Sequence, residues 1–242
     1  MEKSETEVNG TKIEVERDSY YLRIFQSTLN LIAHLLIGAV VGICIIFAFR
    51  NGVPMNTTKK HVILCVLGYQ LLMAEAILAL CPHNGWTAGL RLLDKRRAHT
   101  VLLIMGSVLA IVGSLLMSAH KTVNFNTVHG KYGLVALVFT TVSLVNGLTS
   151  LYGYELRKYI PENFSKIPHI IFGVIAFVSS LICLCYGLDY DSFKEWSSRV
   201  GAPYGCAYTV MGLAAAYTFI IIINPVITAF NKSKRMYTIM KL

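Results

Sequence analysis

Residues 129–147 read HGKYGLVALVFTTVSLVNG, and residues 169–187 read HIIFGVIAFVSSLICLCYG. Each run begins with a histidine and has small residues at the same offsets of 4, 7, 11, 14 and 18. The matching residues are Gly133, Ala136, Thr140, Ser143 and Gly147 in the first run, and Gly173, Ala176, Ser180, Cys183 and Gly187 in the second. Spacing of this kind forms one stripe of a helix. The stripe permits close helix packing, and with a histidine at its head it also suits a flat macrocycle lying between helices.

These runs belong to a longer segment with four histidines, His61, His99, His129 and His169, each at the start of a separate apolar run. Six runs of the chain are long enough to span a bilayer. They are Leu29–Phe49, His61–Cys81, Ala98–Ala119, His129–Tyr152, His169–Gly187 and Gly205–Phe230. A chain of 242 residues with 55% hydrophobic and 14% charged residues is too apolar for a soluble domain. We predict an all-α membrane protein with six transmembrane helices, in which the second to fifth form a central four-helix bundle.

The order of the runs predicts how the four histidines pair. Consecutive spanning helices enter the membrane from opposite sides, so the starts of the second and fourth helices share one face. The starts of the third and fifth share the other. We therefore expect His61 to lie with His129, and His99 to lie with His169.

The net charge of +9 indicates topology rather than nucleic-acid binding. With the amino terminus inside, the cytoplasmic segments hold fifteen Lys and Arg residues and the other side holds seven. This asymmetry places both termini in the cytoplasm. The predicted organisation is a mobile cytoplasmic tail at 1–28, a six-helix domain at 29–230 and a basic cytoplasmic tail at 231–242.

The cysteines and histidines restrict the kind of cofactor. All six cysteines lie inside or at the ends of apolar runs and none forms a CxxC motif, which argues against attached c-type haem, an iron–sulfur cluster and a disulfide scaffold. The chain also lacks the clustered histidines of di-metal membrane enzymes. Single imidazoles on separate helices indicate instead a cofactor held between the helices of a bundle, as haem often is.

Two further polar residues lie within the predicted spans. His34 is expected either to bond a neighbouring side chain or to donate to the edge of a cofactor. Glu75, which is placed on one stripe with His61, should face the bundle interior or water. Proton handling and a structural hydrogen bond both stay open for its role.

Several short segments resemble the cytochrome b561 family, especially its short transmembrane reductases. They are Leu72-Met73-Ala74-Glu75-Ala76, Lys95-Arg96-Arg97-Ala98-His99, Ala119-His120-Lys121, His129-Gly130-Lys131-Tyr132-Gly133, and His169 with Gly173. The resemblance implies two b-type haems per chain, the inner one held by His99 and His169 and the outer one by His61 and His129. It further implies electron transfer from cytoplasmic ascorbate to monodehydroascorbate radical or a ferric iron chelate on the other side. An endomembrane location (endoplasmic reticulum or vesicle) and a homodimer also follow from it as expectations.

Candidate substrate residues lie at both membrane faces. Lys95, Arg96 and Arg97 could gather anionic ascorbate, although topology alone also explains this cluster. Lys95 is the expected proton acceptor because arginine is a poor base, and His120 with Lys121 is expected to receive the acceptor. A haem-free proton-coupled transporter using Glu75 and the histidines is the competing function, and a membrane scaffold is the third.

Overall fold

The computed structural model describes residues 2–151, 162–203 and 205–241, with side chains described for 19–151, 166–203, 205–238 and 241. The longer helices are α1 (Glu2–Phe49), α4 (Leu92–His120), α5 (Val128–Leu151), α7 (Glu162–Leu188) and α9 (Cys206–Met240). The second span combines α2 (Thr57–Cys65), the π-helical segment η1 (Val66–Met73) and α3 (Ala74–Leu78). Two short helices lie between spans, η2 (Gly85–Thr87) and α8 (Asp191–Arg199).

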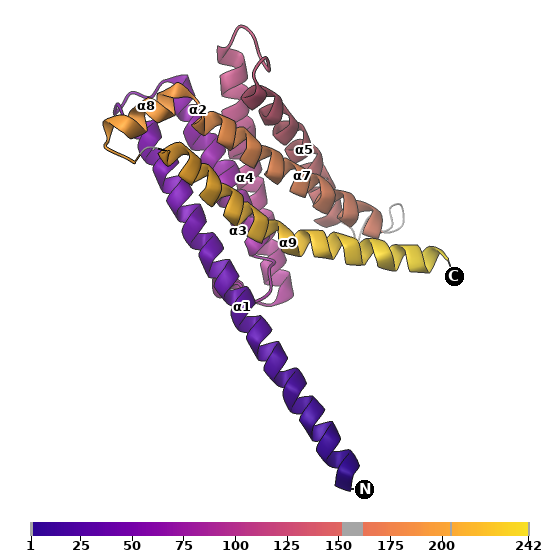
Figure 1. The fold of residues 1–242 in the computed structure, drawn as a ribbon. Coiled ribbons are helices and arrows are strands. Elements are labelled where there is room, and N and C mark those ends of the chain that lie inside the picture. The colour runs from indigo at the N-terminus through magenta and orange to yellow at the C-terminus, as the bar shows by residue number, and fades with distance from the viewer. Residues whose placement is uncertain (1, 152–161, 204, 242) are drawn as a thin grey trace.

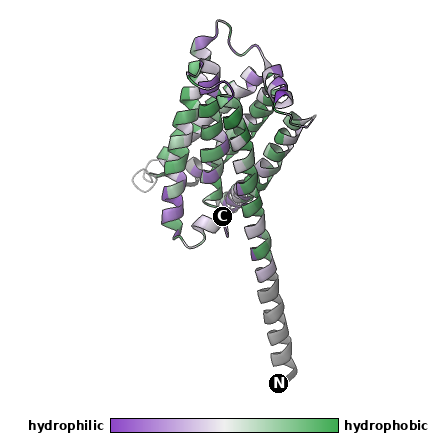
Figure 2. Cartoon of the chain, turned by 90° about the vertical axis from the view of Figure 1, so that its left-hand side faces the viewer, coloured by the Kyte–Doolittle hydropathy of each residue, from purple (hydrophilic) through white to green (hydrophobic). Residues whose placement is uncertain are grey.

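Six stretches of the described residues are long and apolar enough to cross a membrane. They are Ser19–Phe49, Thr57–Leu78, Leu92–His120, Val128–Leu151, Lys166–Leu188 and Cys206–Thr238. Figure 2 shows apolar residues along the middle of the bundle and more polar ones towards its ends. No strand occurs within the described ranges. The predicted all-α membrane protein with six spans is confirmed.

The helices form a bundle from which the first part of α1 extends (Figure 1). We call the end of the bundle from which α1 extends the inner face, and the opposite end the outer face. α5 packs along α7, and the second span packs against α4. Helices α1 and α9 pack against each other, and α9 also packs on α7. The second span, α4, α5 and α7 therefore contact one another as a group of four, and α1 and α9 pack against this group and supply many of the buried core residues.

The two expected tails are helical in the structure. α1 begins at Glu2 and continues without a break into the first span, and α9 continues to Met240. Pro225 lies inside α9, and Figure 1 shows α9 changing direction along its course. A proline within a helix removes one backbone hydrogen bond and kinks the helix.

The second span departs from a regular α-helix at η1. A π-helical turn accommodates one additional residue, so every position beyond it is rotated relative to an uninterrupted α-helix. The predicted stripe that joined His61 to Glu75 is therefore wrong. Glu75 lies beside α1, whereas the next residue, Ala76, faces α4.

The π-helical segment also lies very close to α4. A Cβ added at Gly68 would be 2.7 Å from the carbonyl oxygen of Gly106, and one added at Gly106 would be 2.9 Å from that of Gly68. Only glycine permits two backbones to approach this closely. The second span and α4 are thus fixed in register at this crossing.

Helix α8 covers part of the outer end of the bundle. Its Phe193 is completely buried and packs against Phe47 of α1, with ring centres 5.1 Å apart. Trp196 completes the cluster at 5.3 Å from the Phe47 ring. Since these aromatic rings join α8 to the end of α1, the segment after α7 is anchored at the outer face.

Candidate functional site

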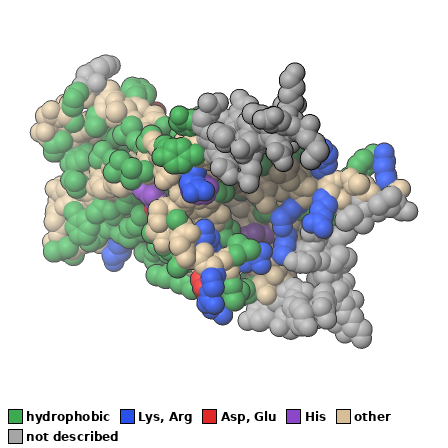
Figure 3. Space-filling view, turned by 90° about the horizontal axis from the view of Figure 1, so that it is seen from below, with side chains coloured by type: hydrophobic (Ala, Val, Ile, Leu, Met, Phe, Trp, Pro, Cys, Tyr) green, Lys and Arg blue, Asp and Glu red, His purple; other side chains and the backbone are tan. Residues whose placement is uncertain are grey.

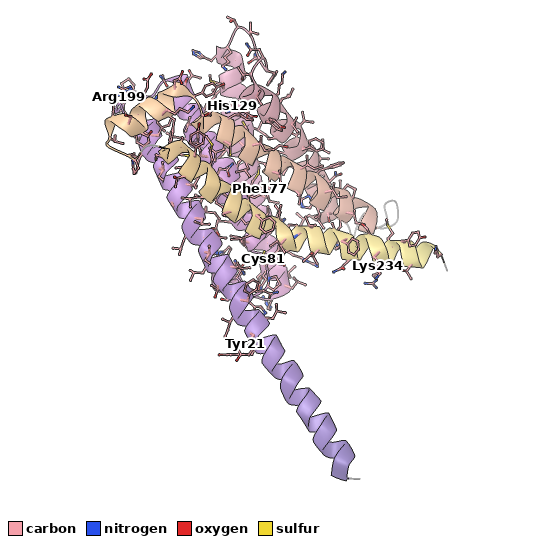
Figure 4. All side chains as sticks on the ribbon, viewed as in Figure 1. Tyr21, Cys81, His129, Phe177, Arg199 and Lys234 are labelled. Carbon is pink, nitrogen blue, oxygen red and sulfur yellow. The ribbon has the colours of Figure 1, made fainter. Side chains whose placement is uncertain are left out.

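The four histidines of the central helices form two pairs. The ring centres of His61 and His129 are 6.2 Å apart, and those of His99 and His169 are 6.1 Å apart. In each pair the two rings are close to perpendicular, at 78° and 87°. His61 therefore lies with His129, and His99 with His169, as expected from the order of the spans. Figure 4 labels His129 at the outer end of the bundle and Cys81 towards the inner end.

In the outer pair, each histidine is oriented by a backbone carbonyl of the neighbouring helix. His61 Nδ1 donates to the Gly113 carbonyl at 2.9 Å, and His129 Nδ1 donates to the Cys183 carbonyl at 2.8 Å. A carbonyl can only accept, so each Nδ1 holds the proton and each Nε2 is left with its lone pair.

The inner pair has the same arrangement. His99 Nδ1 donates to the Ala76 carbonyl at 2.8 Å, and His169 Nδ1 donates to the Ser143 carbonyl at 2.9 Å. Within the described part of the chain, no group hydrogen-bonds Nε2 of either inner histidine. Metal-bound histidines typically have one nitrogen bonded to a carbonyl while the other binds the metal.

Each of the four spans carries a histidine near its start and, further along, a carbonyl that accepts from a histidine of a neighbouring span. The number of residues between the two is nearly the same in every span. Ser143, Cys183 and Gly113 lie 14 residues after His129, His169 and His99, whereas Ala76 lies 15 residues after His61. The additional residue in the second span is accommodated by η1. Fourteen residues of α-helix rise about 21 Å, so the two pairs are well separated along the bundle.

Two glycines of the predicted stripes make room for the imidazole rings. Gly147 lies against His169, where an added Cβ would be 2.9 Å from Cε1 of the ring. Gly187 lies against His129, where the corresponding distance would be 3.3 Å. Each stripe of small residues therefore ends beside the histidine that begins the other stripe. These two glycines therefore accommodate the imidazole rings, in addition to allowing the two helices to pack closely.

The geometry of both pairs fits a metal held between two imidazoles. Two rings bound through roughly 2 Å bonds, each with its centre about 1 Å behind the nitrogen, have centres about 6 Å apart. The observed distances of 6.2 Å and 6.1 Å match this separation. In the described residues, no group of three or more His, Cys, Asp or Glu could hold a metal ion, so each pair is a two-ligand arrangement.

A cavity of about 1010 Å³ adjoins the outer pair. Both His61 and His129 line it, together with Gly133 and Ala136 of the first small-residue stripe. This volume is at the upper end of the range for cofactor and ligand sites. The outer pair therefore faces space that suits a large, flat cofactor.

Residues 60–195, more than half of the chain, match the family described as eukaryotic cytochrome b561. The chain belongs to the cytochrome b561 family. It is 25% identical to Transmembrane reductase CYB561D2 of Mus musculus over 228 residues, which cover 93% of this chain and 98% of the relative. The Homo sapiens protein of the same name is 24% identical over the same shares. Haem b is the cofactor of this family, and all four paired histidines lie within the matched segment.

His34 of this cytochrome b561 bonds its neighbours through both ring nitrogens. Nδ1 lies 2.7 Å from Glu75 Oε1, and Nε2 lies 2.7 Å from Asn84 Oδ1. Of the two roles expected for His34, the structure therefore shows the hydrogen bond to neighbouring side chains. Neither nitrogen is left to donate to a cofactor edge. Asn30 Nδ2 donates to the Pro82 carbonyl at 2.9 Å and holds the same loop against α1.

The basic cluster expected to gather ascorbate lies at the start of α4. Arg97 is paired with Asp94 at 3.2 Å, and Arg96 is exposed. Lys95 is half-buried near Cys81. Burial raises the pKa of the Cys81 thiol, whereas a hydrogen bond with Asn224 and the charge of Lys95 lower it. Figure 3 shows Lys and Arg side chains gathered on this inner face.

The residues expected to receive the acceptor lie at the outer face. His120 is the last residue of α4 and is exposed, and Lys121 follows it. Both line the outer cavity that also contains the His61 and His129 rings. The structure therefore brings His120 and Lys121 to the mouth of the space beside the outer pair.

Buried polar side chains connect the central helices between the two pairs. Gln70 of η1 accepts from the Tyr217 hydroxyl of α9 and donates to Ser180 of α7 at 3.4 Å. Its neighbour Tyr69 accepts from Thr140 of α5 at 3.4 Å. These contacts hold η1 against three other helices in the bundle core.

Several site residues are not evident from sequence. Tyr190, whose ring centre is 5.7 Å from that of His129, and Asn84 both lie outside the spanning runs. The four carbonyl acceptors have no sequence signal of their own, since every residue has a carbonyl. Gly147 and Gly187 do have a signal, because they end the two matched stripes.

Proposed function

We propose that this protein is a transmembrane reductase that moves electrons from cytoplasmic ascorbate to an acceptor on the other side of the membrane. The acceptor is monodehydroascorbate radical or a ferric iron chelate. The observation that supports this most strongly is the presence of two imidazole pairs, one near each membrane face, with metal-binding ring separations. The name of the mammalian relatives, transmembrane reductase, supports the same activity.

His99 and His169 would hold an inner haem b, and His61 and His129 an outer one. When bound there, haem would supply one-electron transfer between ferric and ferrous iron. The carbonyls of Ala76, Ser143, Gly113 and Cys183 accept from Nδ1 of the four rings, which leaves each Nε2 its lone pair for the iron. They also increase the basicity of the ligands by accepting hydrogen bonds from their Nδ1–H groups.

At the inner face, Lys95 and Arg96 attract ascorbate, which is an anion at neutral pH. Each ascorbate that gives up one electron also gives up one proton. Lys95 accepts this proton, a role for which arginine is a poor base. The pairing of Arg97 with Asp94 leaves Lys95 and Arg96 as the main attraction for an anion.

At the outer face, His120 and Lys121 position the acceptor beside the outer cavity. Monodehydroascorbate radical takes up one electron and one proton to become ascorbate. His120, whose imidazole lines the outer cavity, supplies that proton. A ferric chelate needs no proton, and Lys121 would attract its anionic ligand.

The alternative function, a haem-free proton-coupled transporter, is less well supported. It relied on Glu75 as a member of a proton relay, but Glu75 and His34 bond each other within the bundle. Membership of the cytochrome b561 family also favours a haem protein. We further propose an endomembrane location with both termini in the cytoplasm, the organisation 1–28, 29–230 and 231–242, and a homodimer.

The function can be tested with purified protein in vesicles that contain ascorbate, with a ferric chelate and ascorbate oxidase outside. The oxidase removes any ascorbate that escapes, so only electrons that cross the membrane reduce the iron. We expect formation of ferrous iron at a rate well above that of protein-free vesicles. A haem-loaded preparation that gives the protein-free rate would overturn the proposal.

A further inference from the structure

The contacts of His129 and His169 are related by an approximate twofold arrangement of α5 and α7. Each ring rests on a glycine of the other helix, Gly187 or Gly147, and donates to a carbonyl of that helix. The residue that supplies this carbonyl is Cys183 for His129 and Ser143 for His169. The two environments therefore match in backbone but differ in one side-chain atom, sulfur against oxygen.

The hydroxyl of Ser143 touches the inner ligand at two points. Ser143 Oγ lies 3.2 Å from His169 Nδ1 and donates to the His169 carbonyl at 3.1 Å. Nδ1 is already the donor to the Ser143 carbonyl. Its proton is thus shared between two oxygen acceptors of one residue.

The thiol of Cys183 has the equivalent position at the outer ligand. Cys183 Sγ lies 3.5 Å from His129 Nδ1 and 3.8 Å from His129 Nε2, and it donates to the His129 carbonyl at 3.4 Å. Sulfur is a much weaker acceptor than oxygen. Cys65 adds a second sulfur to the outer site, 3.5 Å from His61 Nδ1.

We propose that Ser143 and Cys183 are positioning residues that set the reduction potentials of the two haems apart, a proposal that rests on the proposed function. A stronger acceptor at Nδ1 draws the proton away from the ring and makes the ligand more electron-rich. An electron-rich ligand stabilises ferric iron, which lowers the reduction potential.

The serine therefore lowers the potential of the inner haem, and the cysteine leaves that of the outer haem higher. This difference favours movement of the electron from the inner face to the outer face. Because the two sites share their backbone contacts, exchanging the two side chains should exchange this contribution.

The test is a spectroscopic redox titration of the full-length protein, with electron paramagnetic resonance of the ferric haems. Cys183→Ser should lower the potential of the outer haem and leave the inner one unchanged. Ser143→Cys should raise the potential of the inner haem. We expect each to change the ferrous-to-ferric ratio at a fixed potential by about threefold to tenfold, tenfold being about 59 mV for one electron. The titrations are repeated in a His99→Ala background to assign the outer haem.

Cys183→Ala is the matched control, because it removes the thiol without adding a hydroxyl. Our proposal predicts no lowering of the outer potential in this variant, whereas an effect of side-chain size predicts that alanine and serine shift it alike. Equal shifts, or no shift with serine, would overturn the proposal while haem content stays at two per chain. If the unmodified protein contained no haem, that result would instead contradict the proposed function.

Discussion

Replacing Gly147 with alanine should displace the inner ligand His169. The added Cβ would lie 2.9 Å from Cε1 and 3.1 Å from Nδ1 of the ring, whereas ordinary contacts begin at 3.4 Å. The ring must therefore move by about 0.5 Å, which is as much as a preorganised site tolerates. Overpacking of this kind costs about 1–3 kcal/mol. When this cost is confined to the haem-bound protein, the affinity for haem at the inner site decreases by about 5-fold to 150-fold.

Two other glycines provide graded controls for Gly147→Ala. At Gly187 the added Cβ would lie 3.3 Å from His129 Cε1, so the outer ring needs to move by only about 0.1 Å and most haem should be retained. At Gly42 of α1 nothing lies within 4 Å, and alanine should be neutral or stabilise the helix by up to about 1 kcal/mol.

The assay is the reduced-minus-oxidised spectrum per chain, with thermal unfolding recorded in parallel. Gly147→Ala should lose inner haem, Gly187→Ala should lose little outer haem, and Gly42→Ala should match the unmodified protein. Full haem content in Gly147→Ala, or equal losses in all three variants, would refute the role assigned to the ring contacts.

Three further predictions concern the ligand and the two surfaces. His99→Ala should remove one haem per chain and abolish rapid reduction by ascorbate, and retention of both would exclude the proposed inner pair. Lys95→Gln should raise the KM for ascorbate by roughly twofold to fivefold, as expected for loss of one partly exposed charge. Lys95→Arg should restore the KM but not proton acceptance, and an unchanged KM in Lys95→Gln would count against the donor site. His120→Ala should slow reduction of the acceptor at unchanged haem content, measured by stopped-flow reoxidation, and a parallel loss of haem would indicate a structural role.

The histidine pairing and the fold class could be predicted from sequence because both follow from the order of apolar runs. Alternate spans begin at the same face, and the position of each histidine in its run then fixes its partner. The matched stripes also located Gly147 and Gly187, although not their contact with the rings. That contact depends on the antiparallel packing of α5 against α7, which places the end of one stripe beside the start of the other.

The interior of the second span could not be predicted in the same way. Residues 66–73 read VLGYQLLM, which contains no proline and gives no local indication of a π-helical turn. The turn follows from tertiary packing, because the close crossing of Gly68 with Gly106 and the contact of Ala76 with His99 must both be satisfied. The bond between His34 and Glu75 is a consequence of the same rotation.

The number of haems per purified chain tests the central claim most directly. Haem extracted as its pyridine complex is measured against protein determined by amino-acid analysis. Two imidazole pairs with the observed geometry predict two b-type haems per chain. A value of zero or one in protein from haem-supplied cells would contradict the account.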